Sequence, residues 1–134
     1  MYNDKIMDRF KNPIYVGEIK DADGIGEVGN VTCGDIMRVY IKVKKVDDNG
    51  NNIVNKDEQT IEDVKCKTYG CVAAIASSDT LCEMAIGRKL KDAAVIKAKD
   101  VIAEMGGDVP NSKVHCSILA HEALAAAIKN YKEK

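Results

Sequence analysis

The sequence lacks several features that would each point to a broad class of protein. Its 20 basic and 21 acidic residues leave a net charge of −1, so no strong field attracts nucleic acid or an anionic membrane. No stretch approaches the roughly 18 apolar residues of a membrane-spanning helix. The start, MYNDKIMDRF, carries acids and an arginine, unlike the apolar run of a secretory signal. We therefore expect a cytoplasmic protein that binds neither nucleic acid nor membrane.

The cysteines also lack the spacing of the common metal motifs. There are five of them but no Cys-x-x-Cys pair, which excludes a zinc ribbon and a ferredoxin. An odd number of cysteines without an export signal argues against a disulfide framework. Each thiol is therefore either a small buried side chain or a ligand or nucleophile.

The apolar pattern predicts one α+β domain over residues 1–134, with a three-stranded antiparallel sheet packed against about five helices. Residues 36–46 and 61–68 alternate as half-buried strands do, and the glycine-rich segment 21–29 is a loop or leads into a first strand. Helical patterns cover residues 3–10, 72–86 and 116–131, and residues 90–105 fit two short helices, the second capped by Asp100. The connection 47–58 is longer than a minimal hairpin turn, and we assign it no role.

The segment from Gly24 to Gly29, GIGEVG, matches the dinucleotide-binding pattern GxGxxG but not its context. That fingerprint follows a strand and opens a helix, so that the pyrophosphate meets the helix N-terminus. Here a polar Asp-Ala-Asp precedes the glycines and an extended strand follows them. We predict instead that the glycines serve a loop and let the backbone fold closely around Cys33.

Two cysteines fit the interior of the domain. Cys66 lies in the apolar phase of its strand and Cys82 lies within a helix, so we predict that both are structural. His121, beside Glu122 on the last helix, has no thiol near it in the sequence, and we predict a surface histidine.

The other three cysteines, Cys33, Cys71 and Cys116, stand in loops or at element boundaries. Cys71 and Cys116 fall at predicted helix N-termini, whose partial positive charge favours the thiolate. Asp35 and His115 add a carboxylate and an imidazole nearby in the sequence. On spacing alone, a joint metal site and scattered free thiols are about equally supported. A nucleophile dyad of His115 and Cys116 is disfavoured, because neighbours on a helix point in different directions.

Four segments together carry a specific resemblance. They are KNPIYVG (11–17), GEVGNVTCGDIM (26–37) with IKV (41–43), IEDVKCKTYGCVAAIASS (61–78) and KVHCSILAHEALAAAIKNY (113–131). In this order they resemble the IscU/NifU-type iron-sulfur cluster assembly scaffolds, and the combination of CGD, KTYGC and HCSILA is highly specific. Lys113 matches a lysine that the family usually has before its His-Cys pair. The resemblance implies that the cluster ligands, which are also the metal ligands, are Cys33, Asp35, Cys71, His115 and Cys116.

What the resemblance implies is an assembly scaffold and sulfur acceptor, not an enzyme. Such proteins receive persulfide sulfur from a cysteine desulfurase, combine it with iron into a 2Fe-2S cluster and pass the cluster to apo-proteins. Cys116, at a helix start, is our first candidate for the persulfide acceptor, and Cys71 is the next. Three thiolates hold iron tightly, whereas His115 or Asp35 in the fourth position leaves an exchangeable corner.

Two alternatives use the same residues. The ligand set could hold Zn2+, which isolated scaffolds of this family often do, and the chain could be a zinc-binding sulfur acceptor that activates a cysteine desulfurase. Members of that second type tend to lack the histidine that His115 provides here. The run Val109-Pro110-Asn111-Ser112-Lys113 departs from the family's Leu-Pro-Pro-Val-Lys motif, which makes recognition by the dedicated chaperone doubtful.

Overall fold

The computed structural model describes residues 2–30, 34–107, 109–110 and 113–134, so Cys33 lies outside the described residues. Three antiparallel strands form one sheet in the order β1-β2-β3, namely β1 (Gly24–Asn30), β2 (Asp35–Lys44) and β3 (Thr60–Tyr69). The described helices are α1 (Asp4–Lys11), α2 (Val72–Ala85), α3 (Leu90–Ala93), α4 (Ala98–Glu104) and α5 (Val114–Lys132), with a 3-10 turn at Lys56–Glu58. The predicted fold class, with three strands and about five helices, is confirmed. None of these described helices combines the length and apolar character that crossing a membrane requires.

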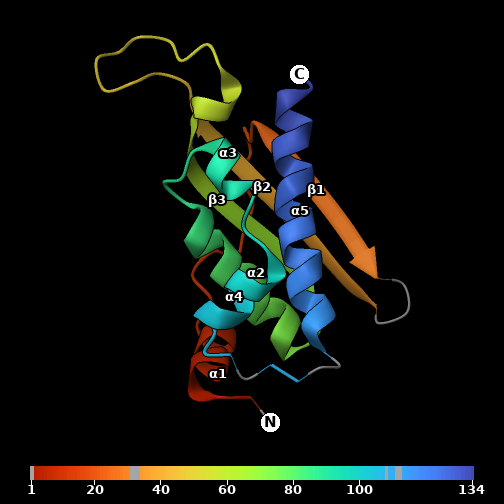
Figure 1. Ribbon diagram of the computed structural model, residues 1–134. Coiled ribbons are helices and arrows are strands. Elements are labelled where there is room, and N and C mark those ends of the chain that lie inside the picture. The colour runs from red at the N-terminus through yellow and green to blue at the C-terminus, as the bar shows by residue number, and fades with distance from the viewer. Residues whose placement is uncertain (1, 31–33, 108, 111–112) are drawn as a thin grey trace.

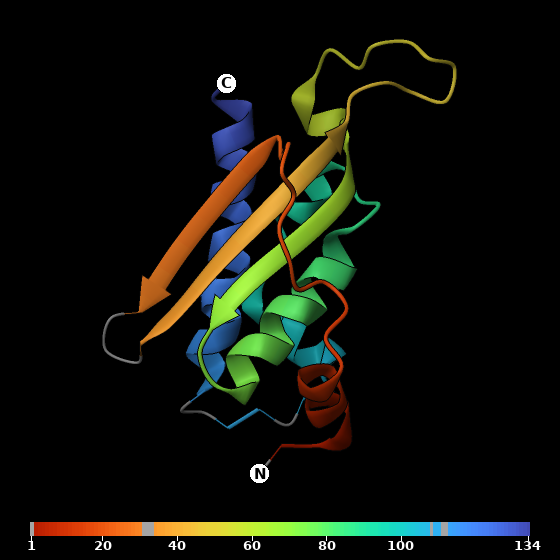
Figure 2. The same ribbon diagram turned by 180° about the vertical axis from the view of Figure 1, so that it is seen from behind.

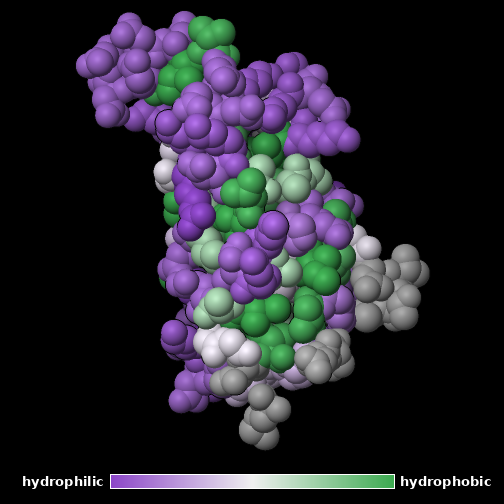
Figure 3. Space-filling view, in the orientation of Figure 1, coloured by the Kyte–Doolittle hydropathy of each residue, from purple (hydrophilic) through white to green (hydrophobic). Residues whose placement is uncertain are grey.

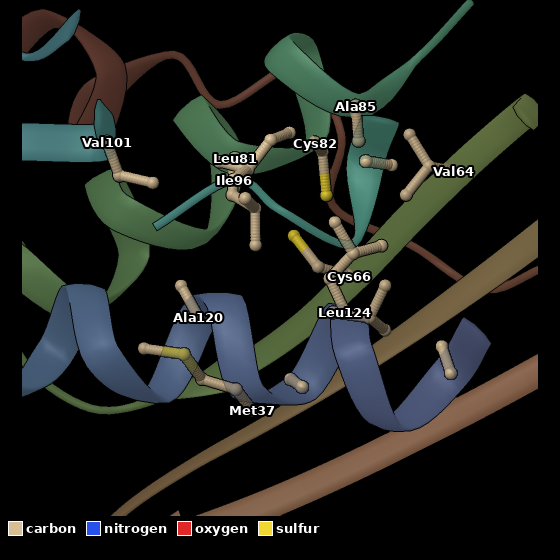
Figure 4. Packing of buried hydrophobic residues seen from close by; sticks show 14 of the residues in the cluster. Met37, Val64, Cys66, Leu81, Cys82, Ala85, Ile96, Val101, Ala120 and Leu124 are labelled. Atoms are coloured by element: carbon tan, nitrogen blue, oxygen red, sulfur yellow. The ribbon is translucent and has the colours of Figure 1, made fainter. Parts of the chain in front are cut away.

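The core lies between the sheet and the helices that cover one of its faces. Figures 1 and 2 show α2, α4 and α5 on the same side of the three strands. The alternation predicted for β2 is confirmed, because one side of the strand supplies fully buried side chains to this core: Met37, Val39, Ile41 and Val43. Figure 4 shows Cys66 on β3 and Cys82 on α2 among the core residues, with their sulfur atoms turned toward each other.

The glycine-rich segment forms strand β1, and its glycines serve helix packing. A Cβ atom at Gly26 would lie 2.3 Å from the carbonyl oxygen of Ala123 and from the backbone nitrogen of Ala127. One at Gly24 would lie 2.3 Å from the carbonyl oxygen of Ala127. The backbones of β1 and α5 therefore approach too closely for any side chain between them. The prediction that these glycines form a loop around Cys33 is wrong, since Gly24, Gly26 and Gly29 all lie within the strand.

The N-terminal part of the chain is tied to α2 by a buried carboxylate. Asp79 is fully buried and accepts hydrogen bonds from the backbone nitrogens of Ile14 (2.9 Å) and Tyr15 (2.7 Å) and from Nη1 of Arg9 (3.0 Å). The next residue, Val16, bridges to Cys66, so the segment between α1 and β1 runs beside β3 (Figure 2). Asp79 thereby fixes the path of the chain from α1 to the sheet.

Two helix starts differ from the predicted ones. Helix α4 begins after Lys97, and Asp100 occupies its first turn, where its carboxylate accepts a hydrogen bond from the Lys97 backbone nitrogen at 2.9 Å. The N-cap residue is therefore Lys97, and Asp100 stabilises the helix start from the first turn. Helix α5 begins at Val114, two residues earlier than predicted, which places Cys116 inside its first turn.

The long connection between β2 and β3 packs against the far end of α5. Nζ of Lys56 donates to the carbonyl oxygens of Tyr131 (3.2 Å) and Lys134 (2.8 Å), and the Tyr131 hydroxyl donates to Gln59. A cation at a helix C-terminus satisfies carbonyls that have no partner within the helix. Figure 3 shows the projecting connection as mostly hydrophilic, with hydrophobic surface lower down, over α4 and the first half of α5. The connection therefore lies at the opposite end of α5 from His115 and Cys116 (Figure 1).

Candidate metal centre

Three elements bring four of the predicted ligands together at one end of the sheet. Asp35 is the first residue of β2, and Cys71 is the N-cap residue of α2, immediately after β3 and Gly70. His115 and Cys116 lie in the first turn of α5. These residues are distant in sequence, and the packing of α2 and α5 across the sheet is what unites them. The fifth predicted ligand, Cys33, lies outside the described part of the chain.

Four of the distances between donor atoms match those of a tetrahedral metal site. The two sulfurs, Sγ of Cys71 and Sγ of Cys116, are 3.8 Å apart. Oδ2 of Asp35 lies 3.3 Å from Nε2 of His115, and Sγ of Cys116 lies 3.5 Å from that oxygen and 3.6 Å from that nitrogen. Tetrahedral Zn2+, with bonds of about 2.3 Å to sulfur and 2.0 Å to nitrogen or oxygen, places donors about 3.8 Å apart for two sulfurs and about 3.3 Å for N and O. The donors of Asp35, Cys71 and Cys116 all lie within 4.8 Å of one another and can therefore bind one ion after a modest movement. His115 lies near Asp35 and Cys116 but is not part of that mutually close group.

Asp35, Cys71 and Cys116 form the compact part of the site. One donor atom from each lies within 4.8 Å of the other two. Cys116 and Asp35 are buried, with 0% and 4% exposure, while Cys71 is half-buried and His115 retains partial access to solvent. Among the described residues, the site therefore has a closed inner side at Cys116 and Asp35 and a more accessible side at Cys71 and His115.

The site gathers negative charge that favours a bound cation. Burial raises the pKa of the Cys116 thiol, and the charges of Cys71 and Asp35 raise it further. The Cys116 thiol is consequently protonated without metal and donates to Oδ2 of Asp35. The charge of Cys71 is the main cause that raises the pKa of the Lys113 ammonium, which lies next to the site. A metal ion would displace the Cys116 proton and offset these like charges.

Two predictions about these residues are wrong. A helix N-terminus was expected to favour the thiolate at Cys116, but in the metal-free protein burial and the neighbouring acids outweigh the helix dipole. His115 and Cys116 were expected to point in different directions, yet Nε2 and Sγ are 3.6 Å apart. Both side chains turn toward Asp35 from the first turn of α5, where no preceding helical turn restricts them.

The residues predicted to lie outside the site do so. Cys66 and Cys82 are each 1% exposed, within the core, which confirms that they are buried. His121 is partly exposed on α5 and is not among the converging side chains. Gly70 is a residue that sequence reasoning missed: a Cβ atom there would lie 2.5 Å from Oδ1 of Asp35. Its position directly before Cys71 was the only signal in the sequence.

Comparison with known proteins shows the family of this chain. The family described as "NifU-like N terminal domain" matches residues 1–134. The chain is 47% identical to "Iron-sulfur cluster assembly scaffold protein IscU 1" of Archaeoglobus fulgidus over 134 residues, which is all of this chain and 78% of that protein. It is 42% identical to "Iron-sulfur cluster assembly scaffold protein IscU" of Escherichia coli over 136 residues, covering 99% of this chain and 95% of the relative.

A solved structure shares the same fold at lower sequence identity. The N-terminal part of a nitrogen-fixing NifU-like protein from Brucella abortus superposes with a TM-score of 0.73 at 18% identity, covering 98% of this chain and 94% of that chain. The sheet and the helices of this chain thus have the fold of that structure. The chain belongs to the IscU/NifU-type family of iron-sulfur cluster assembly scaffolds, as the sequence resemblance predicted.

Proposed function

We propose that this chain is a scaffold on which 2Fe-2S clusters are assembled from iron and the persulfide sulfur of a cysteine desulfurase. The cluster is then transferred to apo-proteins in the cytoplasm. The chain acts as a sulfur acceptor and carrier, not as an enzyme. The names of its relatives support the scaffold role. The observation that carries the proposal is the convergence of the donor atoms of Asp35, Cys71 and Cys116 within 4.8 Å of one another, with His115 beside Asp35 and Cys116.

The proposed ligand set combines three sulfurs with one harder donor. Cys71 and Cys116 supply two sulfurs, and Cys33, two residues before Asp35 in the sequence, supplies the third. His115 or Asp35 occupies the fourth position. Soft thiolates hold iron in clusters, whereas a carboxylate or imidazole donor makes one corner easier to exchange. Because a scaffold must release its cargo, this mixed set suits transfer better than four cysteines would.

Assembly of the cluster requires electrons as well as iron and sulfur. Two cysteine persulfides react with two Fe2+ ions and two electrons from an external donor. Each S–S bond breaks, returning the cysteine thiolate and releasing sulfide. The four electrons needed by the two sulfurs come from the donor (two) and from oxidation of both irons to Fe3+ (two). Assembly therefore needs access for an electron donor, and the partial exposure of Cys71 and His115 supports such access.

We propose that Cys116 is the first acceptor of persulfide sulfur and that Cys71 is the next. Acceptance at Cys116 requires its buried thiol to become accessible and to lose its proton, because in this conformation the more accessible sulfur is that of Cys71, 3.8 Å away. Mass spectrometry after reaction with a desulfurase and cysteine, without iron, locates the added sulfur. Persulfide on Cys116 in the Cys71→Ala variant is the expected result, and its loss there would make Cys71 the entry point.

Anaerobic assembly followed by visible absorption tests the proposed function. The protein is incubated with a cysteine desulfurase, cysteine, Fe2+ and a reductant, and then freed of small molecules. We expect a coloured 2Fe-2S chromophore in the wild type and in the Cys66→Ser control, and none in Cys71→Ala or Cys116→Ala. A colourless protein that holds zinc and stimulates the desulfurase would instead support the alternative role of a zinc-binding sulfur acceptor.

A further inference from the structure

Gly70, between β3 and Cys71, lies directly against the carboxylate of Asp35. A Cβ atom at position 70 would be 2.5 Å from Oδ1 of Asp35, 3.0 Å from its Cγ and 3.0 Å from Cβ of Ala74. Ordinary contacts of a Cβ atom begin at 3.4 Å. A side chain at position 70 therefore cannot coexist with the carboxylate in its observed place.

The register of the sheet explains this contact. Ile36 and Tyr69 are the last pair of β2 and β3, so Asp35 and Gly70 are the next positions along the two strands. Facing residues of antiparallel strands project their side chains to the same side of the sheet. Asp35 directs Oδ2 toward His115 and Cys116, at 3.3 and 3.5 Å, and Oδ1 fills the space that a side chain at position 70 would take.

The backbone itself does not require glycine at this position. The described glycines with a positive φ angle are at other positions, which include Gly34, next to Asp35. An alanine can therefore adopt the backbone conformation of Gly70 without strain. What glycine provides here is space, and Asp35 occupies that space.

We propose that Gly70 is a positioning residue for the metal centre: because it has no side chain, the Asp35 carboxylate can lie between β3 and α5 and reach the bound ion. This inference rests on the proposed role of Asp35 as a ligand. An alanine at position 70 displaces Oδ1, and since both oxygens belong to one carboxylate, Oδ2 leaves its observed position beside His115 and Cys116. The Gly70→Ala variant should then bind metal as Asp35→Ala does.

Titration with Co2+ alone, in competition with a chelator, tests the proposal. Displacing an oriented ligand typically weakens metal binding by about 10- to 100-fold, and we expect that loss in Gly70→Ala. The Co2+ absorption spectrum should change as it does in Asp35→Ala, because both variants remove the same donor. Gly29→Ala is the matched control: its Cβ would lie 3.5 Å from the backbone oxygen of Asp35, an ordinary contact, so affinity should be unchanged.

The double variant separates positioning from a general structural role. If Gly70 acts only through the carboxylate, Gly70→Ala has no further effect on Co2+ affinity in the Asp35→Ala background. Wild-type affinity in either single variant, or losses that multiply in the double variant, would overturn the proposal. If Gly70→Ala alone does not fold, recovery of folding in the double variant supports the proposal, and failure of both contradicts it.

The same titration keeps this inference distinct from the proposed function. Co2+ binding requires neither a desulfurase nor sulfide. A protein that shows the expected Co2+ pattern but assembles no cluster would contradict the scaffold role and leave the role of Gly70 standing. If Gly70→Ala assembles the cluster normally and binds Co2+ with unchanged affinity, the scaffold role stands and the proposed role of Gly70 is contradicted.

Discussion

Gly26→Ala should push α5 away from the sheet. The new Cβ atom would lie 2.3 Å from the carbonyl oxygen of Ala123 and from the backbone nitrogen of Ala127. Because ordinary contact begins at 3.4 Å, the helix and the strand must separate by about 1.1 Å, the difference between the two distances. The obstacle is backbone, so no side-chain rotation can relieve it.

The energetic cost follows from that separation. A gap of 0.5–1 Å removes about a quarter to a half of the dispersion attraction between the separated atoms. Overpacking of this kind costs about 1–3 kcal/mol, while replacing glycine by alanine in a strand returns about 0.5–1 kcal/mol. With a rigid obstacle the upper range applies, and we expect a net loss of about 2 kcal/mol, equivalent to a decrease in Tm of roughly 8 °C for a domain of this size.

Thermal and urea unfolding of Gly26→Ala and Gly29→Ala measure this difference. Gly29 lies in the same strand, but a Cβ atom there would lie 3.5 Å from its nearest neighbour, so Gly29→Ala should be as stable as the wild type or slightly more stable. If Gly26→Ala unfolds at the same temperature as Gly29→Ala, then close approach of α5 is not what requires glycine in β1.

Three other substitutions test separate features of the molecule. Asp79→Ala removes the buried partner of Arg9 and should lower the free energy of unfolding, measured with urea, by about 3–5 kcal/mol. Glu83→Ala removes the exposed partner and should lower it by less than about 1 kcal/mol. Equal losses in the two variants would refute the role of Asp79 as a buried ion-pair partner. Asp35→Ala weakens the binding of a single divalent ion. The same substitution should slow the transfer of an assembled cluster to an apo-acceptor, because it removes the most exchangeable donor. Faster transfer from the variant than from the wild type would contradict this. Cys82→Ala should assemble the cluster normally, and a colourless protein in the assembly assay would make Cys82 a ligand.

The strands and helices with strong apolar periodicity could be predicted from the sequence. The alternation of Met37, Val39, Ile41 and Val43 marks the buried face of β2, and the structure confirms it. Strand β1 gave only a weak signal, because Gly24 and Gly26 carry no side chain that could alternate. Their strand is defined by the close approach of α5, a tertiary contact that the local sequence does not encode.

The sequence indicated which residues converge at this end of the sheet, but it did not indicate their geometry. The spacing of Cys33, Cys71 and Cys116 did not distinguish scattered free thiols from one metal site. The predicted ligand set came from the family resemblance. The 3.6 Å approach of His115 and Cys116 depends on where α5 starts relative to β2, which local patterns do not determine. The raised pKa of Cys116 likewise depends on burial and on the facing Asp35, and both arise only when distant segments pack together.

Metal and sulfide analysis of protein assembled anaerobically with a cysteine desulfurase tests the scaffold role most directly. Two iron atoms and two acid-labile sulfides per bound cluster, with both lost in Cys116→Ala, is the predicted result. Bound metal without sulfide in the wild type, under conditions where the desulfurase delivers sulfur, would contradict the proposal that a cluster is built on these side chains.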